Sequence, residues 1–286
     1  MNFLKIISFV DIFTYYIILR CGYNTIAEVI RNFLKGNYTP MIKKVFPALA
    51  VMTAGLVPCT SVYAIDNTKI GYGQGTAVDG KNRPTDALAF NDRYADYDAC
   101  AISGDENRII ITFDQGYENG YTEKILDTLK EKNVKAIFFL TGDYAKKEKA
   151  LVQRMIDEGH VLGNHGMKHA SLPTLSKKQA EEEIMSLHDY VMNNYGYQMQ
   201  YFRCPCGEYS EQALETVQKC GYKTLFWSFA YVDWKTDSQP DPAMGLKKLT
   251  ESVHGGEILL LHSVSSTNAE ILGEVIDNFR AKGFTV

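Results

Sequence analysis

The chain has 286 residues, of which 45% are hydrophobic and 22% are charged, so it is long and apolar enough to bury a large core. Its formal net charge of −4 argues against nucleic acid or anionic lipid as the main partner, since both are gathered by a strongly basic surface. A neutral glycan is compatible with this charge.

Residues 41–64 have the form of an export signal. Residues 41–44 read Met-Ile-Lys-Lys, an apolar run covers 45–57, and residues 61–64 read Ser-Val-Tyr-Ala. A basic start, an apolar stretch and small residues before the cut are the three parts of a secretory signal peptide. We therefore expect cleavage after Ala64.

The upstream segment 1–40 has no clear role if this signal is used, and Met41 is then the true start. Two alternatives stay open. Residues 3–19 form a second apolar run that could anchor the chain in a membrane, and Cys59 could take a lipid anchor. The N-terminal sequence of the exported protein distinguishes the three.

Four of the six cysteines lie beyond the expected cleavage site, and export permits disulfides. Two of them are separated by one proline, a spacing too tight for easy pairing and without the second cysteine pair of a zinc ribbon. We interpret the four as free or occasionally bridged thiols: Cys100, Cys204, Cys206 and Cys220.

A polar segment, residues 65–106, precedes the main domain. It is rich in Gly, Asp and Asn and lacks sustained periodicity, so we expect a lead-in that lies over the surface. In residues 107–286, short apolar runs alternate with amphipathic stretches at helical spacing. The predicted strands are Ile109–Phe113, Lys135–Leu140, Val161–Asn164, Gln200–Arg203, Thr224–Trp227, Glu257–His262 and Phe284–Val286.

Capping residues support these divisions. Ser176 and Gln179 form a capping box at one helix start, and Ser210 stands where the next helix should begin. Glycines that can take the left-handed conformation are expected to end helices: Gly159, Gly221, Gly255 and Gly283. About seven strands in β/α alternation predict an α/β fold, a distorted (β/α) barrel, in preference to a sandwich.

Polar side chains stand at the carboxyl ends of the predicted strands, where the chemistry of such barrels gathers. These residues are Asp114, His165, Arg203, Asp233 and His262. They are scattered in the sequence but should converge in space.

Two histidines, His165 and His169, are separated by four positions just after a strand. If the segment turns helically, both imidazoles lie on one face and can bind one metal ion, with zinc a common choice. A pair of this kind is more often structural, and its place after a strand is what favours a metal site.

The other candidates also have ordinary readings. Asp114, exposed at a strand end, could be a catalytic base or could only cap the following turn. Arg203, in a rigid turn, could hold a carboxylate in a fixed orientation, although an Arg-x-Pro motif is more often structural. Asp233 calls for the same caution, and His262 could be a satisfied core histidine.

Five motifs in this order and spacing resemble the polysaccharide deacetylase family, also called the NodB-homology or carbohydrate esterase 4 family. They are Thr-Phe-Asp-Gln-Gly, His-Gly-Met-Lys-His, Arg-Cys-Pro-Cys-Gly, Asp-Trp and Leu-Leu-His-Ser, and the resemblance covers residues 107–286. The run Gly-Tyr-Glu-Asn-Gly at 116–120 is most similar to the spore-associated branch, which removes acetyl from muramic acid before the muramic δ-lactam forms.

The resemblance implies a base, an acid and a metal site. Asp114 would be the general base, His165 and His169 metal ligands, and His262 the general acid. Amide hydrolysis needs these parts, since a water must become nucleophilic, an oxyanion must be stabilised and the departing amine needs a proton.

Four further residues would support them. Arg203 would orient the base and Asp233 would tune the acid. The Cys206 backbone N–H would help to bind the oxyanion, and Trp234 would line the groove.

One residue departs from the family pattern. Gln115 stands where most members have a second aspartate that completes the metal triad, and a neutral amide is a poorer ligand for a divalent ion. The muramic-acid branch often carries an amide here. Gln115 is therefore expected as the third ligand, with weak binding or a water in its place as the alternative.

The sequence thus predicts an exported hydrolase that depends on a divalent metal ion, zinc by preference, and removes N-acetyl groups from peptidoglycan in the cell wall or spore cortex. Alternatives are an inactive glycan-binding module and a chitin or xylan deacetylase with the same chemistry. A monomer is expected, with no nucleic-acid partner and membrane contact only through an uncleaved N-terminal segment.

Overall fold

The computed structural model describes residues 65–286. The expected upstream segment, export signal and Cys59 anchor lie outside the described residues. Within 65–286, no helix is both long enough and apolar enough to cross a membrane.

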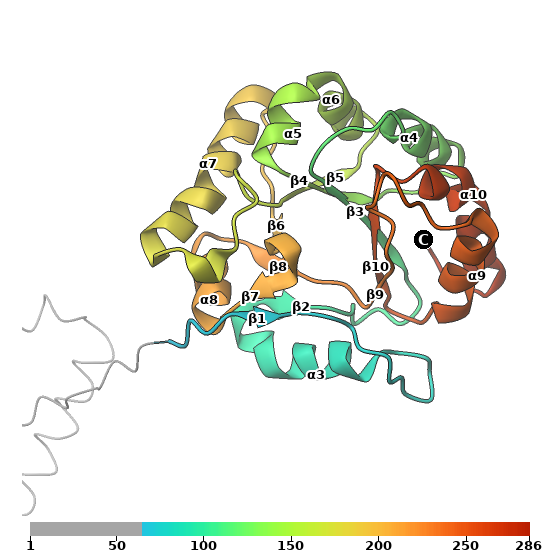
Figure 1. The fold of residues 1–286 in the computed structure, drawn as a ribbon, viewed down its shortest axis with the longest axis horizontal. Helices are drawn as coiled ribbons and strands as arrows, with labels where there is room; N and C mark the ends of the chain where they lie inside the picture. Colours follow the sequence, from blue (N-terminus) through green and yellow to red (C-terminus); the bar gives the residue numbers. More distant parts are fainter. Residues whose placement is uncertain (1–64) are drawn as a thin grey trace, which may run out of the picture. The chain divides into compact units, whose positions relative to one another are not determined.

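A parallel sheet of eight strands, in the order β2-β8-β6-β5-β4-β3-β10-β9, forms the centre of the domain (Figure 1). Its edge strands β2 and β9 do not pair with each other, so the barrel is open on one side. This confirms the expected distorted (β/α) barrel. The strands are β2 Ala99–Cys100, β3 Ile110–Gln115, β4 Ile137–Leu140, β5 Val161–Asn164, β6 Tyr201–Phe202, β8 Lys223–Leu225, β9 Phe229–Ala230 and β10 Ile258–His262.

The helices surround these strands on the outside (Figure 1). They are α3 Thr85–Tyr94, α4 Thr122–Glu131, α5 Gly142–Lys147, α6 Lys149–Asp157, α7 Lys177–Tyr195, α8 Glu211–Lys219, α9 Pro242–Ser252 and α10 Ser266–Ala281. Three short 3₁₀ turns, η1 Ala95–Tyr97, η2 Leu172–Thr174 and η3 Pro205–Gly207, complete the connections. A separate two-stranded sheet joins β1 Ile70–Gly71 to β7 Glu208–Tyr209.

The predicted helix starts are confirmed. Ser176 and Gln179 form a complete capping box on α7, and the Ser210 side chain accepts the Ala213 N–H at the start of α8. Gly159, Gly221 and Gly283 have the expected positive φ. The prediction for the fourth glycine, Gly255, was wrong: α9 ends at Ser252, and a Cβ on Gly255 would lie 2.2 Å from the Glu106 carbonyl oxygen. Close backbone approach, not a helix end, requires glycine there.

The last predicted strand, Phe284–Val286, was also wrong. Only Thr285 forms a bridge, to Arg108 beside β3, and residues 284 and 286 join no ladder. Two strands that the sequence did not suggest, β2 and β9, take the edges of the sheet. Each has two residues, too few for a hydrophobic pattern to reveal.

The lead-in segment 65–106 is part of the fold and does more than cover its surface. It contributes the edge strand β2 and the helix α3, which buries Phe90 and Tyr94. The ring of Tyr72 packs on Phe90 and Phe226 at 5.1 and 4.6 Å between centroids. Its apolar side chains follow no sustained period, and for that reason the sequence did not reveal this role.

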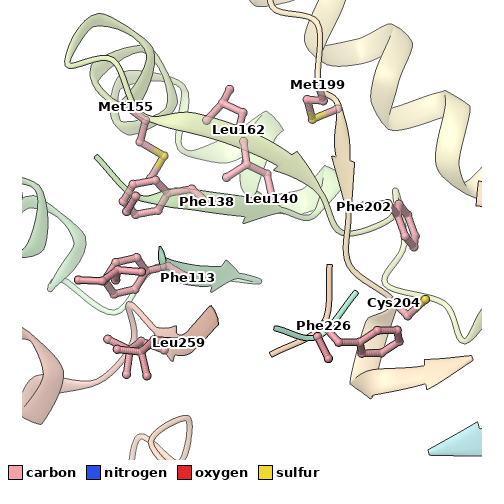
Figure 2. Packing of buried hydrophobic residues seen from close by; sticks show 14 of the residues in the cluster. Phe113, Phe138, Leu140, Met155, Leu162, Met199, Phe202, Cys204, Phe226 and Leu259 are labelled. Atoms are coloured by element: carbon pink, nitrogen blue, oxygen red, sulfur yellow. The ribbon is translucent and has the colours of Figure 1, made fainter. Parts of the chain in front are cut away.

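The main core lies around the central strands (Figure 2). Phe113 of β3 stacks on Phe138 of β4, with ring centroids 5.1 Å apart. Every residue of β4 is buried. Strands covered on both faces read as continuous apolar runs, and these were the strands that the sequence located well.

A buried carboxylate, Glu257, lies just before β10, at the end of that strand opposite to His262. It is fully buried, and its Oε1 has no hydrogen-bond partner among residues 65–286. Burial raises its pKa to about 8, although the His254 N–H that it accepts opposes the shift.

We expect Glu257→Gln to stabilise the protein at alkaline pH. The folded-state pKa of Glu257 lies above its unfolded value. The protonated carboxyl of the wild type therefore makes its full contribution to the free energy of unfolding below about pH 4.5, and this contribution is lost as pH rises through about 8. Between about pH 5 and 8 the loss should be on the order of 3 kcal/mol. Urea unfolding of both proteins at the two pH values measures it, and a parallel pH dependence in both would contradict the expectation.

Candidate active site

A cavity of about 820 Å³ opens at the carboxyl ends of the central strands. Six of the residues singled out from the sequence line it: Asp114, His165, His169, Cys206, Trp234 and His262. Arg203 and Asp233 are fully buried behind this wall. The structure therefore brings together eight of the nine predicted site residues.

Strand register explains why the predicted base and acid are neighbours. Asp114 and His262 are paired positions of the parallel strands β3 and β10, at the last pair of their ladder. Side chains at paired positions point to the same face of a sheet. Both therefore reach the cavity from one edge.

Arg203 fixes the Asp114 carboxylate. Its Nη1 donates to Asp114 Oδ1 at 2.8 Å and to Thr112 Oγ1 at 2.8 Å. Its Nε and Nη2 donate to the carbonyl oxygens of Leu225 and Phe226 at 3.0 Å each, so four of the five N–H donors of this buried guanidinium have a partner. These bonds hold the guanidinium in a fixed orientation beside its carboxylate partner.

Charge outweighs burial at Asp114. Burial alone would raise the pKa of this carboxyl, but the charge and hydrogen bond of Arg203 and the charge of His262 lower it, and the net pKa lies below the usual 3.8. Asp114 is thus ionised at neutral pH and able to accept a proton.

Asp233 holds His262 by two bonds. Its Oδ1 lies 2.7 Å from His262 Nδ1, and its Oδ2 accepts the His262 backbone N–H at 2.8 Å. Asn268 of α10 donates to the same Oδ2 at 2.6 Å. Burial would lower the pKa of His262, but the hydrogen bond and charge of Asp233 raise it above 6.5 overall. With Nδ1 occupied, Nε2 is left for a substrate.

The two histidines of the predicted metal site face each other, with His165 Nε2 and His169 Nε2 3.1 Å apart. They meet through a loop, not through the helical turn considered above. Gly166 and His169 take φ values of 84° and 58°. A non-glycine residue in this conformation costs roughly 1–3 kcal/mol, so the surrounding contacts must hold it.

The chemistry of this pair fits a divalent ion. The Arg203 carbonyl oxygen lies 2.8 Å from His165 Nδ1, which places the proton on Nδ1 and leaves the Nε2 lone pair free. Burial lowers the pKa of His165 to about 4 and that of His169 in the same direction, so both rings are neutral, as metal ligands must be. Asp114 Oδ2 lies 3.5 Å from His165 Nε2.

Gln115, the predicted third ligand, is not on the cavity wall. Successive strand residues point to opposite faces, so its amide turns away from the side taken by Asp114 and donates to Ser263 Oγ at 2.7 Å. Its Oε1 is buried without a hydrogen-bond partner among the described residues. Among residues 65–286, no three His, Cys, Asp or Glu side chains form a complete metal-binding group. Ligation by Gln115 stays a prediction.

Calorimetric titration with zinc tests that prediction. We expect Gln115→Asp to bind zinc at least about tenfold more tightly than Gln115→Asn, because ligand charge sets the affinity of a cation site. The two variants have the same length and differ in charge, so the comparison isolates the carboxylate. Equal affinities would show that position 115 is not a ligand.

Several supporting residues escaped sequence reasoning. Gln74, in the lead-in segment, accepts the Trp227 Nε1–H at 2.8 Å and donates to the Ala230 carbonyl oxygen at 3.0 Å, which fixes one wall of the cavity. Asn268 stands behind Asp233. No local pattern marks Gln74. Asn268 shares the helical spacing of the apolar residues Ile271 and Leu272, and a polar residue at such a position was a usable signal.

Comparison with known proteins agrees with this geometry. Residues 101–225 match the polysaccharide deacetylase family. The chain is 38% identical over 239 residues to the peptidoglycan-N-acetylmuramic acid deacetylase PdaA of Bacillus subtilis, covering 82% of this chain and 89% of that protein. It is 32% identical over 195 residues to a peptidoglycan-N-acetylglucosamine deacetylase of Bacillus cereus, covering 65% of this chain and 68% of that one.

Solved structures give the same assignment. The structure of Bacillus subtilis PdaA, a family 4 carbohydrate esterase, aligns with a TM-score of 0.73 and covers 77% of this chain and 95% of that one. A Bacillus anthracis family 4 pseudoenzyme, in a mutant form with restored enzymatic activity, aligns at 25% identity and a TM-score of 0.62, over 66% and 68% of the two chains. The chain therefore belongs to the polysaccharide deacetylase family, carbohydrate esterase family 4.

Proposed function

We propose that this protein is a metal-dependent hydrolase that removes N-acetyl groups from peptidoglycan, with N-acetylmuramic acid as the sugar. The observation that carries the proposal is that two titrating groups in one cavity have pKa values shifted in opposite directions. Asp114 is ionised beside Arg203, whereas His262 has a raised pKa beside Asp233. Environments that push two pKa values apart in this sense define a base and an acid.

Attack on the acetyl carbonyl is the task of the base. A divalent ion bound by His165 and His169 would make a water more acidic and polarise the carbonyl. Asp114 takes the proton of the attacking water, and Arg203 keeps the carboxylate aimed. The Cys206 N–H, presented at a turn with φ of 57°, donates to the developing oxyanion.

Departure of the amine is the task of the acid. His262 gives its Nε2 proton to the sugar nitrogen, and Asp233 stabilises the imidazolium and keeps the ring in place. Trp234, 46% exposed and 5.5 Å from His262 between ring centroids, offers a face on which a sugar ring can stack.

A lysine on the cavity wall favours the muramic sugar. N-acetylmuramic acid differs from N-acetylglucosamine by a lactyl group next to the acetamide, and its carboxylate is an anion where no peptide is attached. Lys168 lines the cavity and forms no ion pair within residues 65–286, whereas Asp143 nearby is paired with Lys147. Lys168 is therefore available to the lactyl carboxylate.

We expect Lys168→Gln to lower kcat/KM on peptide-free muramic substrates about fivefold, the value of a partly exposed ion pair near 1 kcal/mol. Activity on N-acetylglucosamine oligomers should stay unchanged. Lys149→Gln, on α6 outside the cavity wall, is the matched control. An equal loss on both sugars would remove Lys168 from substrate selection.

The decisive experiment measures acetate release by the purified protein from muramic-acid-containing peptidoglycan and from chitin oligomers, with zinc and with chelator. Metal-dependent release from peptidoglycan is expected. Release from chitin alone would keep the chemistry and overturn the sugar.

A second candidate is a glycan-binding module without catalysis. The neutral Gln115 favours it, and the family includes a pseudoenzyme. The complete base and acid pairs argue against it, because binding needs neither. Glycan binding without acetate release from either substrate would support the module.

Action on peptidoglycan requires export, and we propose that residues 41–64 direct it, to the cell wall or spore cortex. Edman sequencing of the secreted protein should begin at Ile65. A chain beginning at Met1 would contradict this.

A further inference from the structure

A buried carboxylate outside the family motifs lies against the histidine loop. Glu183 belongs to α7 and is 6% exposed. The other buried residues of this helix are apolar: Ala180, Ile184, Leu187 and Val191. A core position on such a helix would be satisfied by another aliphatic side chain, and a buried charge is tolerated only where partners compensate it.

The partners of Glu183 are the backbone N–H groups of the histidine loop. Its Oε1 accepts from the Lys168 N–H at 2.6 Å and from the Ala170 N–H at 3.2 Å. Its own carbonyl oxygen accepts from the Met167 N–H at 3.1 Å. Three of the loop's donors therefore end on this one residue.

The conformation of the loop depends on this acceptor. Lys168 and Ala170 flank His169, whose φ of 58° turns both N–H groups inward around the Glu183 oxygen. Backbone N–H groups gathered by a left-handed residue form a concavity that binds an anion. A Cβ on Gly166 would lie 2.7 Å from the same oxygen, so the glycine makes room for it.

We propose that Glu183 is a positioning residue that holds His169 opposite His165 and so sets the affinity of the pair for a divalent ion. The proposal rests on the proposed function in taking this pair as the metal site. Without the carboxylate, two N–H groups lose their acceptor, and His169 has no reason to keep its unfavourable φ. The two Nε2 atoms, now 3.1 Å apart, would then separate.

The test is zinc affinity by calorimetry, without substrate, for the wild type, Glu183→Ala and Glu183→Gln. Loss of a group that orients a metal ligand weakens binding about 10- to 100-fold, and we expect this for Glu183→Ala. Glu183→Gln keeps a carbonyl oxygen as acceptor, and its affinity should return to within about fivefold of the wild type. Recovery of zinc affinity in Glu183→Gln would show that the acceptor oxygen at position 183, and not its negative charge, holds the loop.

A matched control comes from Asn91 of α3. Its Oδ1 accepts the Ala101 and Ile102 N–H groups at 2.7 and 3.4 Å and so clamps a loop that does not line the cavity. Asn91→Ala should lose stability without losing zinc affinity. If Glu183→Ala fails to fold, Gly166→Ala, which presses on the same oxygen, should weaken zinc binding in its place.

The outcomes separate the two proposals. Zinc binding by a folded Glu183→Ala at wild-type affinity would overturn the positioning role and leave the proposed function intact. A wild type that binds no zinc would overturn both.

Discussion

Replacement of Asp114 by asparagine is expected to lower kcat for acetate release by about 10³-fold, within the range for loss of a general base. Asparagine has the same shape and can still accept from Arg203 through its oxygen, so the cavity should keep its form. It cannot take a proton from water. The assay uses saturating peptidoglycan and zinc-loaded enzyme, so that the measured loss of rate is a loss in kcat.

Stability must be followed in the same variant, because Arg203 is fully buried and would lose its counter-charge. Removing one partner of a buried pair costs about 3–5 kcal/mol, so urea unfolding has to show that the assay temperature leaves the protein folded. Asp277→Asn breaks the surface pair with Lys132 and should leave kcat unchanged. A folded Asp114→Asn that retains more than about a tenth of the wild-type rate would remove Asp114 as the base.

The strands that carry the base and the acid were predictable because they are long and buried on both faces. The expected Glu257–His262 differs from β10 by one residue, and Ile109–Phe113 overlaps most of β3. The short strands β2 and β9 were not predictable. Two residues cannot show a period, and pairing with distant neighbours alone makes them strands.

Some residues of the candidate site were predictable from the sequence and others were not. Residues that end a strand with a charge, such as Asp114 and His262, stand out against the apolar run before them. Gln74 and Glu183 do not, because their contacts lie 153 and 15 residues away along the chain and follow no spacing rule. The helical turn considered for the histidines assumed local bonding, whereas the loop satisfies its N–H groups on α7.

Loss of the proton donor should change the pH dependence of the activity as well as its rate. His262 must be protonated to act as acid, so activity should be lost as pH rises through its pKa. Burial alone would place that pKa below 6.5, and Asp233 reverses the shift. His262→Ala should lose about 10²- to 10³-fold in kcat together with this alkaline limb. A His262→Ala variant with full activity would eliminate the acid role.

The variant Asp233→Asn tests whether Asp233 raises the pKa of His262. Asparagine can still accept the His262 backbone N–H, and its amide removes the charge that favours the imidazolium, so burial becomes the dominant influence and the pKa of His262 should fall. The alkaline limb of kcat should then move to lower pH by at least about one unit, with a deficit that is small near pH 6 and about tenfold or more near pH 8. Asn268→Ala removes one donor from Asp233 and leaves the charge. It should therefore move the alkaline limb less than Asp233→Asn does. A limb at the same pH in wild type and Asp233→Asn, both folded, would mean that the group titrating there is not His262. The raised pKa would then have no part in the departure of the amine.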